Sequence, residues 1–290
     1  MSKPCRVSVI MPCFNHGEYL PEAVASVTNI GRDDIELIVV DDGSTDERTG
    51  KEMERLCEQG IKVIRQENKG LAAARNAAVL ASEGEYLFPL DADDRLRAGW
   101  MDHGIGILDS DAQVGVVYGD AQCFGARTKH WRGGPFVGDK LLFANFIHAS
   151  ALYRRTVWEQ NGGYDGGMPV QGLEDWDFWL GALEHGWRFA YLPEVFFDYR
   201  QAEGSMLTRA IPRYDEVRDY AARKHGVLYR QAWLSGISER ESILNTHQSV
   251  RWTIRNLREL LKSRLKERVK EADPATGKRA IDNGLPWNFE

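Results

Sequence analysis

Three acidic side chains directly follow a short apolar run in the first third of the chain. The run ends at Leu90 and continues into Asp91-Ala92-Asp93-Asp94. Such a run is typical of a buried strand whose last residues emerge at the edge of a sheet. Carboxylates there suit Mg²⁺ or Mn²⁺, ions that usually share a substrate's phosphates with one or two protein carboxylates. The motif predicts a metal and diphosphate site, although a D-x-D alone is more often a solvated turn with a helix cap.

A second acidic pair, Asp41-Asp42, ends another apolar run, which spans Ile35–Val40. A carboxylate at the end of a strand can accept a hydrogen bond from a ring N–H of a nucleobase or from a ribose hydroxyl. The alternative is that these acids and the turn after them only cap the helix expected at 47–58. Two acidic strand ends in one crevice favour the ligand site.

Two arginines are candidates for phosphate binding, because a guanidinium can meet phosphate oxygens in a bidentate geometry. Arg75 stands in the helix expected after Gly70, at the same edge of the sheet as the acids. Its alternative role is that of an exposed helix residue. Arg200 follows the last expected strand and is the second candidate.

The pair Glu174-Asp175 stands where a later helix is expected to begin. The positive end of the helix dipole holds carboxylates ionised at such a place, and an ionised carboxylate is what a general base needs. The alternative is that both are ordinary acids of a first turn, with Trp176 and Trp179 on the buried stripe that fixes the helix. The spacing alone leaves both interpretations open.

Other catalytic patterns are absent from the sequence. The histidines, among them His16, His103 and His148, have no ligand spacing such as H-x-x-x-H, so we expect them to be structural or exposed. The sequence has no G-x-G-x-x-G after the first expected strand, which argues against dinucleotide binding. It also lacks the G-x-x-x-x-G-K-[ST] of a P-loop and the G-x-S-x-G nucleophile motif.

The candidate residues need a scaffold, and the first third of the chain predicts one in which strands and helices alternate. Apolar runs at 6–11, 35–40, 61–65 and 85–90 predict strands, the first of which stops at Pro12. Helices are expected from residue 18, at 47–58 and at 71–82, the last closed by Gly84. This alternation indicates a Rossmann-like, mainly parallel sheet with helices on both faces. Ligands bind at the carboxyl ends of such strands, so Pro12 to Asn15 would share one crevice with both acidic motifs.

Beyond Leu96 the spacing of elements loosens. We expect a helix at 98–109, a strand at 114–118, an irregular glycine-rich loop at 125–138 and a strand at 147–153. A short helix at 156–161, a helix from 172 to 185 and a last strand at 188–192 follow.

The overall composition limits the classes of protein that need to be considered. In a chain of 290 residues with 43% hydrophobic content, a net charge of −6 argues against a nucleic-acid binder driven by overall charge. The four cysteines form no C-x-x-C pair, so they suggest neither zinc nor disulfides and fit a reducing cytoplasm. No stretch approaches the ~20 apolar residues that span a bilayer, and no signal peptide is visible.

The chain changes character at about residue 206, so we expect a domain at 1–205 and a helical C-terminal extension at 206–290. Residues 251–270 carry eight Lys or Arg against two Glu beside an apolar stripe, the pattern of a basic amphipathic helix. One hypothesis is peripheral contact with anionic lipid at the inner face of the membrane. The other is that the stripe packs on the domain or on a partner subunit of an oligomer.

Five motifs occur in a fixed order along the chain. They are Val-Ser-Val-Ile-Met-Pro-Cys-Phe-Asn at 7–15, Val-Val-Asp-Asp-Gly-Ser-Thr-Asp at 39–46, Asn68-Lys69-Gly70 with Ala74-Arg75-Asn76, Leu-Asp-Ala-Asp-Asp at 90–94, and Glu174-Asp175-Trp176. In this order and spacing they closely resemble the family 2 glycosyltransferases of GT-A fold, over about residues 5 to 206.

The resemblance assigns roles to individual residues. It implies that three residues hold a nucleoside and that Arg75 lies near the diphosphate. It also implies that Asp93 binds Mn²⁺ or Mg²⁺, that Asp91 assists at the ribose or metal, and that Asp175 is the catalytic base. The three nucleoside residues would be Pro12, Asn15 and Asp42. The segment from Tyr199 resembles the family's closing Y-R-x-H segment, but Ala202 stands where many members have histidine, which puts a metal or phosphate contact at that point in doubt.

The implied activity is inverting, metal-dependent transfer of a sugar from a nucleotide-diphosphate sugar, with a UDP-sugar favoured, to a hydroxyl acceptor. That acceptor would be a saccharide or a lipid-linked molecule in the synthesis of cell-surface polysaccharide or glycolipid. One rival is a sugar nucleotidyltransferase, which needs a Gly-rich, basic loop after its first strand, and residues 13–17 are a poor one. The other is a non-catalytic nucleotide-sugar sensor, which would have no need of Glu174-Asp175.

Overall fold

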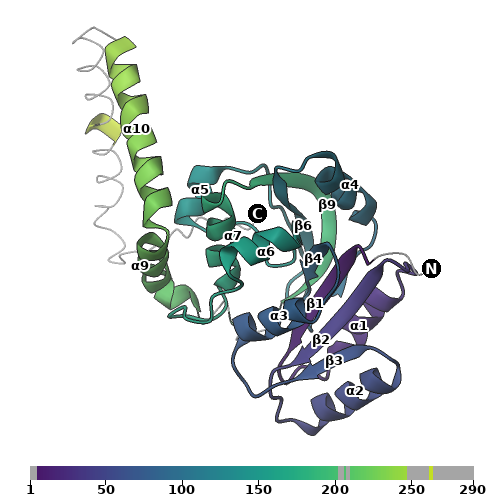
Figure 1. The fold of residues 1–290 in the computed structure, drawn as a ribbon. Helices are drawn as coiled ribbons and strands as arrows, with labels where there is room; N and C mark the ends of the chain where they lie inside the picture. Colours follow the sequence, from purple (N-terminus) through teal and green to yellow (C-terminus); the bar gives the residue numbers. More distant parts are fainter. Residues whose placement is uncertain (1–4, 202–205, 207–209, 247–260, 264–290) are drawn as a thin grey trace, which may run out of the picture. The chain divides into compact units, whose positions relative to one another are not determined.

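A computed structural model describes residues 5–201, 206, 210–246 and 261–263 of the chain (Figure 1). The chain divides into two compact units, Met1–Val227 and Leu228–Glu290. The candidate site residues all belong to the first unit. The functional division into 1–205 and 206–290 stays a prediction.

The first half of the central sheet is parallel, as the alternation of strands and helices predicts. Its strands lie in the order β3-β2-β1-β4 and all pair in parallel. Helices α1 and α2 cover one face and α3 covers the other (Figure 1). The bounds are β1 Val7–Cys13, α1 Leu20–Thr28, β2 Ile35–Asp41, α2 Glu47–Glu58, β3 Lys62–Arg65, α3 Leu71–Leu80 and β4 Tyr86–Pro89.

The first strand does not stop at Pro12, as expected from the sequence, but continues to Cys13 beside β2. In a strand between two parallel neighbours, the backbone polar groups of successive residues point to opposite neighbours, so every second residue faces the same one. Ile10 accepts a hydrogen bond from Leu90 N on the β4 side, so Pro12 also faces that side. The pairing with β4 ends at Ile10, so the missing N–H of Pro12 costs no ladder hydrogen bond.

The second half of the sheet is mixed rather than parallel. The full order is β3-β2-β1-β4-β8-β6-β9-β5, with β7 beside β6. The pair β6/β9 is parallel, whereas β4/β8, β6/β8, β5/β9 and β6/β7 are antiparallel. The bounds are β5 Arg95–Leu96, β6 Val114–Gly125, β7 Lys129–Trp131, β8 Leu152–Arg154 and β9 Arg188–Gln201.

Several expected boundaries in this half are therefore wrong. Strand β6 runs past residue 118, and β7 lies in the segment expected to be irregular. Strand β9 runs past residue 192 and includes Arg200. The extensions of β6 and β9 are held by their pairing with each other, and β7 is held by a hairpin with β6. Periodicity within one segment does not report such pairing.

The remaining helices pack around the sheet through large aromatic side chains. The ring of Trp100, just before α4, stacks on Phe196 of β9 at 3.9 Å between centroids. The ring of Tyr214, at the start of α9, stacks on that of Trp176 of α7 with 5.2 Å between centroids, so α9 packs against α7. The bounds are α4 Met101–Ser110, α5 Gly138–Phe143, α6 Arg155–Asn161, α7 Glu174–Glu184, the 3-10 helix η1 Ile211–Arg213, α9 Tyr214–Lys224 and α10 Gly226–Thr246.

Other expectations concern membrane contact and cysteines. Among the described residues, no helix has the length and apolar character needed to cross a bilayer. Of the basic segment 251–270 the structure describes only 261–263, which are helical; the rest lies outside the described residues, and membrane contact stays a prediction.

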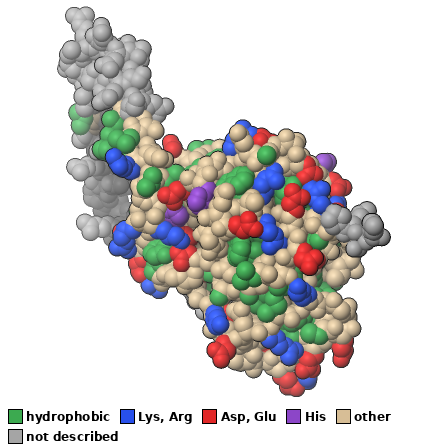
Figure 2. Space-filling view, in the orientation of Figure 1, with side chains coloured by type: hydrophobic (Ala, Val, Ile, Leu, Met, Phe, Trp, Pro, Cys, Tyr) green, Lys and Arg blue, Asp and Glu red, His purple; other side chains and the backbone are tan. Residues whose placement is uncertain are grey.

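All four cysteines are free thiols, as expected from their spacing. Figure 2 shows acidic and basic side chains interspersed over one face of the molecule.

Gly84 does not close α3, whose C-cap is Ala81. It lies against β1 instead and donates its N–H to Ser8 Oγ at 2.8 Å. A Cβ at this position would stand 2.6 Å from the backbone nitrogen of Ser8. The glycine is thus required by the close approach of two backbones.

We expect Gly84→Ala to lower the free energy of unfolding by about 1–3 kcal/mol, because the methyl group has to displace backbone. Gly99→Ala is the matched control, since a Cβ there meets nothing within 4 Å. Urea denaturation of both variants measures the difference. Equal stability of the two would contradict the close approach.

Candidate active site

The acidic loop Asp91–Asp94 begins where β4 ends. Its turn is closed by a hydrogen bond from Asp94 N to Asp91 O at 3.0 Å. The Asp94 side chain is fully buried: Oδ1 accepts from Arg200 N at 2.8 Å, and Oδ2 has no partner in the described part of the chain. Asp94 is therefore not the solvated helix cap that the sequence leaves open. It anchors the loop from inside.

Arg200 supports the same loop from β9. Its Nε donates to the carbonyl oxygen of Asp93 at 2.8 Å. The guanidinium carbon lies 4.4 Å from the ring centroids of both Tyr19 and Phe124, and the group also pairs with Glu22. The described contacts of Arg200 are thus with protein, and a contact with the nucleotide stays a prediction.

The three acids differ in protonation. Burial raises the pKa of Asp91, but Arg75, with His148 and His16 adding to its effect, holds that pKa below its ordinary value. Burial and then the neighbouring Asp91 raise the pKa of Asp93. Burial, with Asp93 and Asp91 adding to it, raises the pKa of Asp94 well above its usual range. The loop therefore concentrates more carboxylate than its surroundings can neutralise.

The acidic loop fits one divalent cation shared with a ligand. The side chain of Asp91 is 31% exposed and bonds Arg75 through Oδ1 only, while that of Asp93 accepts no hydrogen bond from another described residue. Hard oxygens from one or two carboxylates are what Mg²⁺ or Mn²⁺ uses beside phosphates. In the described residues no three His, Cys, Asp or Glu side chains form a closed metal cage.

Arg75 is the cation at the centre of the site. It is 2% exposed, so the alternative of an exposed helix residue is wrong. Its Nη2 bonds Asp91 Oδ1 at 2.8 Å, and its guanidinium carbon lies 5.6 Å from the ring centroid of Tyr164. Burial opposes its charge, but Asp91, Tyr164, Glu174 and Asp175 together hold the pKa of Arg75 above its ordinary value.

Asp175 lies in the first turn of α7 and faces this cation. Its Oδ2 accepts from Asn145 Nδ2 at 2.9 Å, and its Oδ1 accepts from Trp176 N at 2.8 Å. Burial raises the pKa of Asp175 to about 7, against the pull of Arg75 and with a further push from Glu174. The group can therefore take up or release a proton near neutral pH.

Asn145 is a positioning residue that the sequence gives no reason to single out. It is buried, its Oδ1 accepts from Ile147 N at 3.1 Å, and its backbone N donates to Tyr214 Oη at 3.2 Å. These contacts fix the amide that holds Asp175. Asn145 and Ile147 belong to the loop before β8, and Tyr214 begins α9. No sequence motif links these two segments, so the sequence could not indicate the contact.

Glu174 has a different environment from its neighbour. Its carboxylate is buried, and both oxygens lie 2.9 Å from Gly172 N. The side chain folds back on the loop that leads into α7. Glu174 thus orders the approach to Asp175, and a direct catalytic role for it stays a prediction.

The predicted nucleotide residues lie together at the ends of β1 and β2. Asp42 is buried; Oδ1 accepts from Lys69 N at 2.9 Å and from Gln66 Nε2 at 2.7 Å, and Oδ2 accepts from Gly70 N at 2.9 Å. Asp41 Oδ1 accepts from Ser44 N at 2.9 Å. Asp42 thus ties two loops together, while Asp41 closes a turn beside it.

Pro12 and Asn15 belong to the same end of the sheet. Pro12 pairs with Val40 inside β1. Asn15 has a left-handed backbone (φ 55°) and accepts from Thr45 N at 2.8 Å through Oδ1. The loops after β1 and β2 are thus joined by side-chain hydrogen bonds at one end of the sheet, and a nucleotide-binding crevice there stays a prediction.

Two histidines lie near Asp91, and the expectation that they are structural or exposed stays a prediction. Both His148 and His16 are close enough to Asp91 to lower its pKa. Burial lowers the pKa of His148 to about 4, with Asp91 opposing and Arg75 assisting that shift. Sequence spacing could not find them, because they come from different loops. The segment that contains Ala202 lies outside the described residues.

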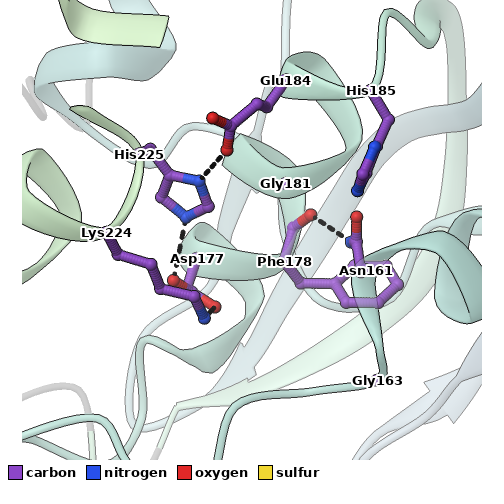
Figure 3. A pocket seen from close by; sticks show the side chains of 9 residues that line it. All are labelled: Asn161, Gly163, Asp177, Phe178, Gly181, Glu184, His185, Lys224 and His225. Carbon is purple, nitrogen blue, oxygen red and sulfur yellow. Dashed lines mark hydrogen bonds and ion pairs between the residues drawn. The ribbon is translucent and has the colours of Figure 1, made fainter. Parts of the chain in front are cut away.

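A pocket of about 170 Å³ lies at α6, α7 and the end of α9, and contains none of the predicted site residues (Figure 3). His225 stands beside it, with Nδ1 2.7 Å from Glu184 and Nε2 3.0 Å from Asp177. Burial opposes its charge, but these two carboxylates raise the pKa of His225. Together with the ion pair Lys224–Asp177 at 2.7 Å, this cluster fastens α9 to the helix that carries Asp175.

The sequence matches the model of glycosyl transferase family 2 over residues 8–166, more than half of the chain. The chain therefore belongs to glycosyltransferase family 2. The PGL/p-HBAD biosynthesis glycosyltransferase of Mycobacterium tuberculosis is 32% identical over 59% of this chain and 67% of its own length. Glycosyltransferase GlyG of Streptococcus pneumoniae is 30% identical over 50% of each chain. The chain thus spans only half the length of the pneumococcal relative.

Solved structures show the GT-A fold. The mannosyltransferase PcManGT from Pyrobaculum calidifontis, in complex with GDP-Man and Mn²⁺, matches with a TM-score of 0.59 and 20% identity over 90% of this chain and 81% of its own. S. aureus TarS 1-349 in complex with UDP-GlcNAc matches with a TM-score of 0.57 and 21% identity over 70% of this chain and 60% of its own. The mixed sheet and its covering helices are confirmed as this fold.

The amide of Asn145 donates to the charged form of Asp175, so its removal favours the protonated acid. We expect Asn145→Ala to move the titration of Asp175 upward from about pH 7 by about one pH unit. The ¹³C carboxyl resonance of Asp175, assigned with Asp175→Asn, measures it. An unchanged midpoint would remove Asn145 from this role.

Proposed function

We propose that this protein is an inverting, metal-dependent glycosyltransferase. It would move a sugar from a nucleoside diphosphate sugar to a hydroxyl group of a saccharide or lipid-linked acceptor. The observation that carries the proposal is that one buried cation, Arg75, interacts with two acids whose pKa values shift in opposite directions. Asp91 is held ionised beside it, and Asp175 has a pKa of about 7.

The chain's own residues supply the steps that move protons and position groups. Asp175 takes the proton of the acceptor hydroxyl while that oxygen attacks the anomeric carbon from the face opposite the nucleotide. The bond from the anomeric carbon to the diphosphate breaks, and its electron pair leaves with the diphosphate. Arg75 offers positive charge next to that leaving group. One displacement at carbon inverts the configuration, and no covalent enzyme intermediate is needed.

The metal would be held by Asp93, with Asp91 as second ligand or as partner of the ribose. A bound Mn²⁺ or Mg²⁺ neutralises charge on a departing diphosphate. The fit rests on the surplus of carboxylate in the acidic loop and on the free side chain of Asp93. The Mn²⁺ present in the PcManGT complex supports the same ion type without selecting between the two metals.

The substrates are proposed at the level of class. TarS is described with UDP-GlcNAc and PcManGT with GDP-Man, so the donor is a nucleotide sugar, with a UDP-sugar as our first choice. The mycobacterial relative is named for PGL/p-HBAD biosynthesis, which supports a product that is a glycolipid or polysaccharide. We place the reaction in the cytoplasm, with peripheral contact at the inner face of the membrane as a hypothesis.

Both rival functions meet specific objections. A nucleotidyltransferase needs free backbone N–H groups in the loop after β1, but Asn15 N donates to Ser44 Oγ and Gly17 N donates to Thr49 Oγ1. A non-catalytic nucleotide-sugar sensor has no use for a buried carboxyl with a pKa of about 7. Product analysis with labelled donor distinguishes all three functions.

Asp175→Asn removes the base but keeps the size of the side chain. We expect sugar transfer to fall by about a hundredfold to ten-thousandfold, with nucleotide binding unchanged. Transfer is measured with radiolabelled donor, and binding of UDP and GDP by calorimetry. Full activity in this variant would exclude Asp175 as the base.

Asp93→Ala removes the proposed metal ligand. We expect the affinity for donor in Mn²⁺ to fall by about tenfold or more, while binding without metal is unaffected. Donor titrations with and without Mn²⁺ make the comparison, and Asp102→Ala, an exposed acid on α4, is the control. Identical Mn²⁺ dependence in wild type and Asp93→Ala would contradict the assignment.

A further inference from the structure

Six tryptophans lie in the described part of the first unit, and five of them use the indole N–H inside the fold. Trp131 differs: it is half-buried in β7, and its indole N–H donates to none of the described residues. The five partners are Phe196 O for Trp100, Asn76 Oδ1 for Trp158, Leu141 O for Trp176, Ile147 O for Trp179 and Gln160 Oε1 for Trp187. A half-buried indole N–H commonly finds a partner, so that of Trp131 is available to a ligand.

A second unused donor stands next to Trp131. His148 Nδ1 accepts a hydrogen bond from Ser150 N at 3.2 Å, so the ring is neutral and carries its proton on Nε2. Within the described chain this Nε2–H has no acceptor. The ring centroid of His148 lies 6.5 Å from that of Trp131 and 4.8 Å from that of Tyr199. We call these three side chains the aromatic wall.

The aromatic wall borders the acids on the side away from the nucleotide residues. In the sheet, β1 and β2 lie on one side of β4, and β8 and β6 lie on the other. His148 precedes β8, Trp131 pairs with Ala121 of β6, and Tyr199 is in β9. His148 is near enough to Asp91 for an electrostatic interaction. A molecule on the wall would therefore approach the acidic loop from the side opposite the donor.

We propose that the aromatic wall is the acceptor subsite and that it takes a neutral saccharide ring. This inference rests on the proposed function and names the substrate class of its second site. Aromatic faces present negative charge to the polarised C–H groups of a sugar ring. The two N–H donors, which carry no formal charge, suit sugar hydroxyl oxygens better than phosphate.

Ligand-observed saturation-transfer NMR tests the subsite on the full chain. The probes are the methyl glycosides of glucose, galactose, mannose and N-acetylglucosamine, each with UDP or GDP and Mn²⁺. In the wild type we expect a saturation-transfer signal for at least one glycoside. That signal should fall about tenfold in Trp131→Ala. It should fall partly in Trp131→Phe and in His148→Phe, because these variants keep a ring but lose the N–H. Trp233→Ala, at an exposed tryptophan of α10, is the matched control and should match the wild type.

Two other outcomes have separate meanings. Wild-type protein that binds UDP or GDP but no glycoside, or undiminished glycoside binding in Trp131→Ala, overturns the subsite and leaves the proposed function standing. Wild-type protein that binds neither nucleotide contradicts the proposed function itself. Thermal unfolding of each variant confirms that a lost signal does not come from a lost fold.

Discussion

The site depends on one buried guanidinium. Arg75 is 2% exposed and contacts Asp91 directly at 2.8 Å. A buried cation without acids, or buried acids without a cation, would each carry a large desolvation cost. The acidic loop after β4 and the first turn of α7 therefore need Arg75 as much as it needs them, although they are more than 80 residues apart in the sequence.

That shared charge has different effects on its two acids. Asp91 makes the direct contact, and the attraction to Arg75 together with the effects of His148 and His16 outweighs burial, so the pKa of Asp91 falls. Asp175 makes no ion-pair contact with Arg75 in the described structure, and burial outweighs the weaker attraction, so its pKa rises to about 7. Direct contact with the cation in one case and its absence in the other thus help to divide the acids into one that stays charged and one that can exchange a proton.

The parts of the site that could be predicted from sequence are those that depend on local patterns, whereas contacts between distant segments could not be predicted. Strands that end in acids place Asp41, Asp42 and Asp91 at one edge, because the carboxyl ends of parallel strands meet there. Asn145 and His148 reach the site only because β8 inserts antiparallel beside β4, a pairing that no periodicity indicates. Arg75 is an ordinary helix position by spacing. It is buried because Tyr164, fixed by Asn76 through two hydrogen bonds at 2.8 Å, lies over that helix.

The same distinction separates the two sides of the site. On the side of β1 and β2, the loops after consecutive parallel strands are joined by hydrogen bonds such as those of Asn15 with Thr45 and of Asp42 with Gly70, and these residues form recognisable motifs. On the other side, the loop before β8, the strand β7 and the end of β9 each contribute one or two side chains. The hairpin of β6 and β7, and the pairing of β6 with the distant strand β9, bring them together. A change of register there would alter which side chains lie near Asp91 while leaving the motifs after β1 and β2 intact. Residue patterns can therefore identify the acids at the ends of the parallel strands, whereas the side chains on the other side of Asp91 have to be found from tertiary structure.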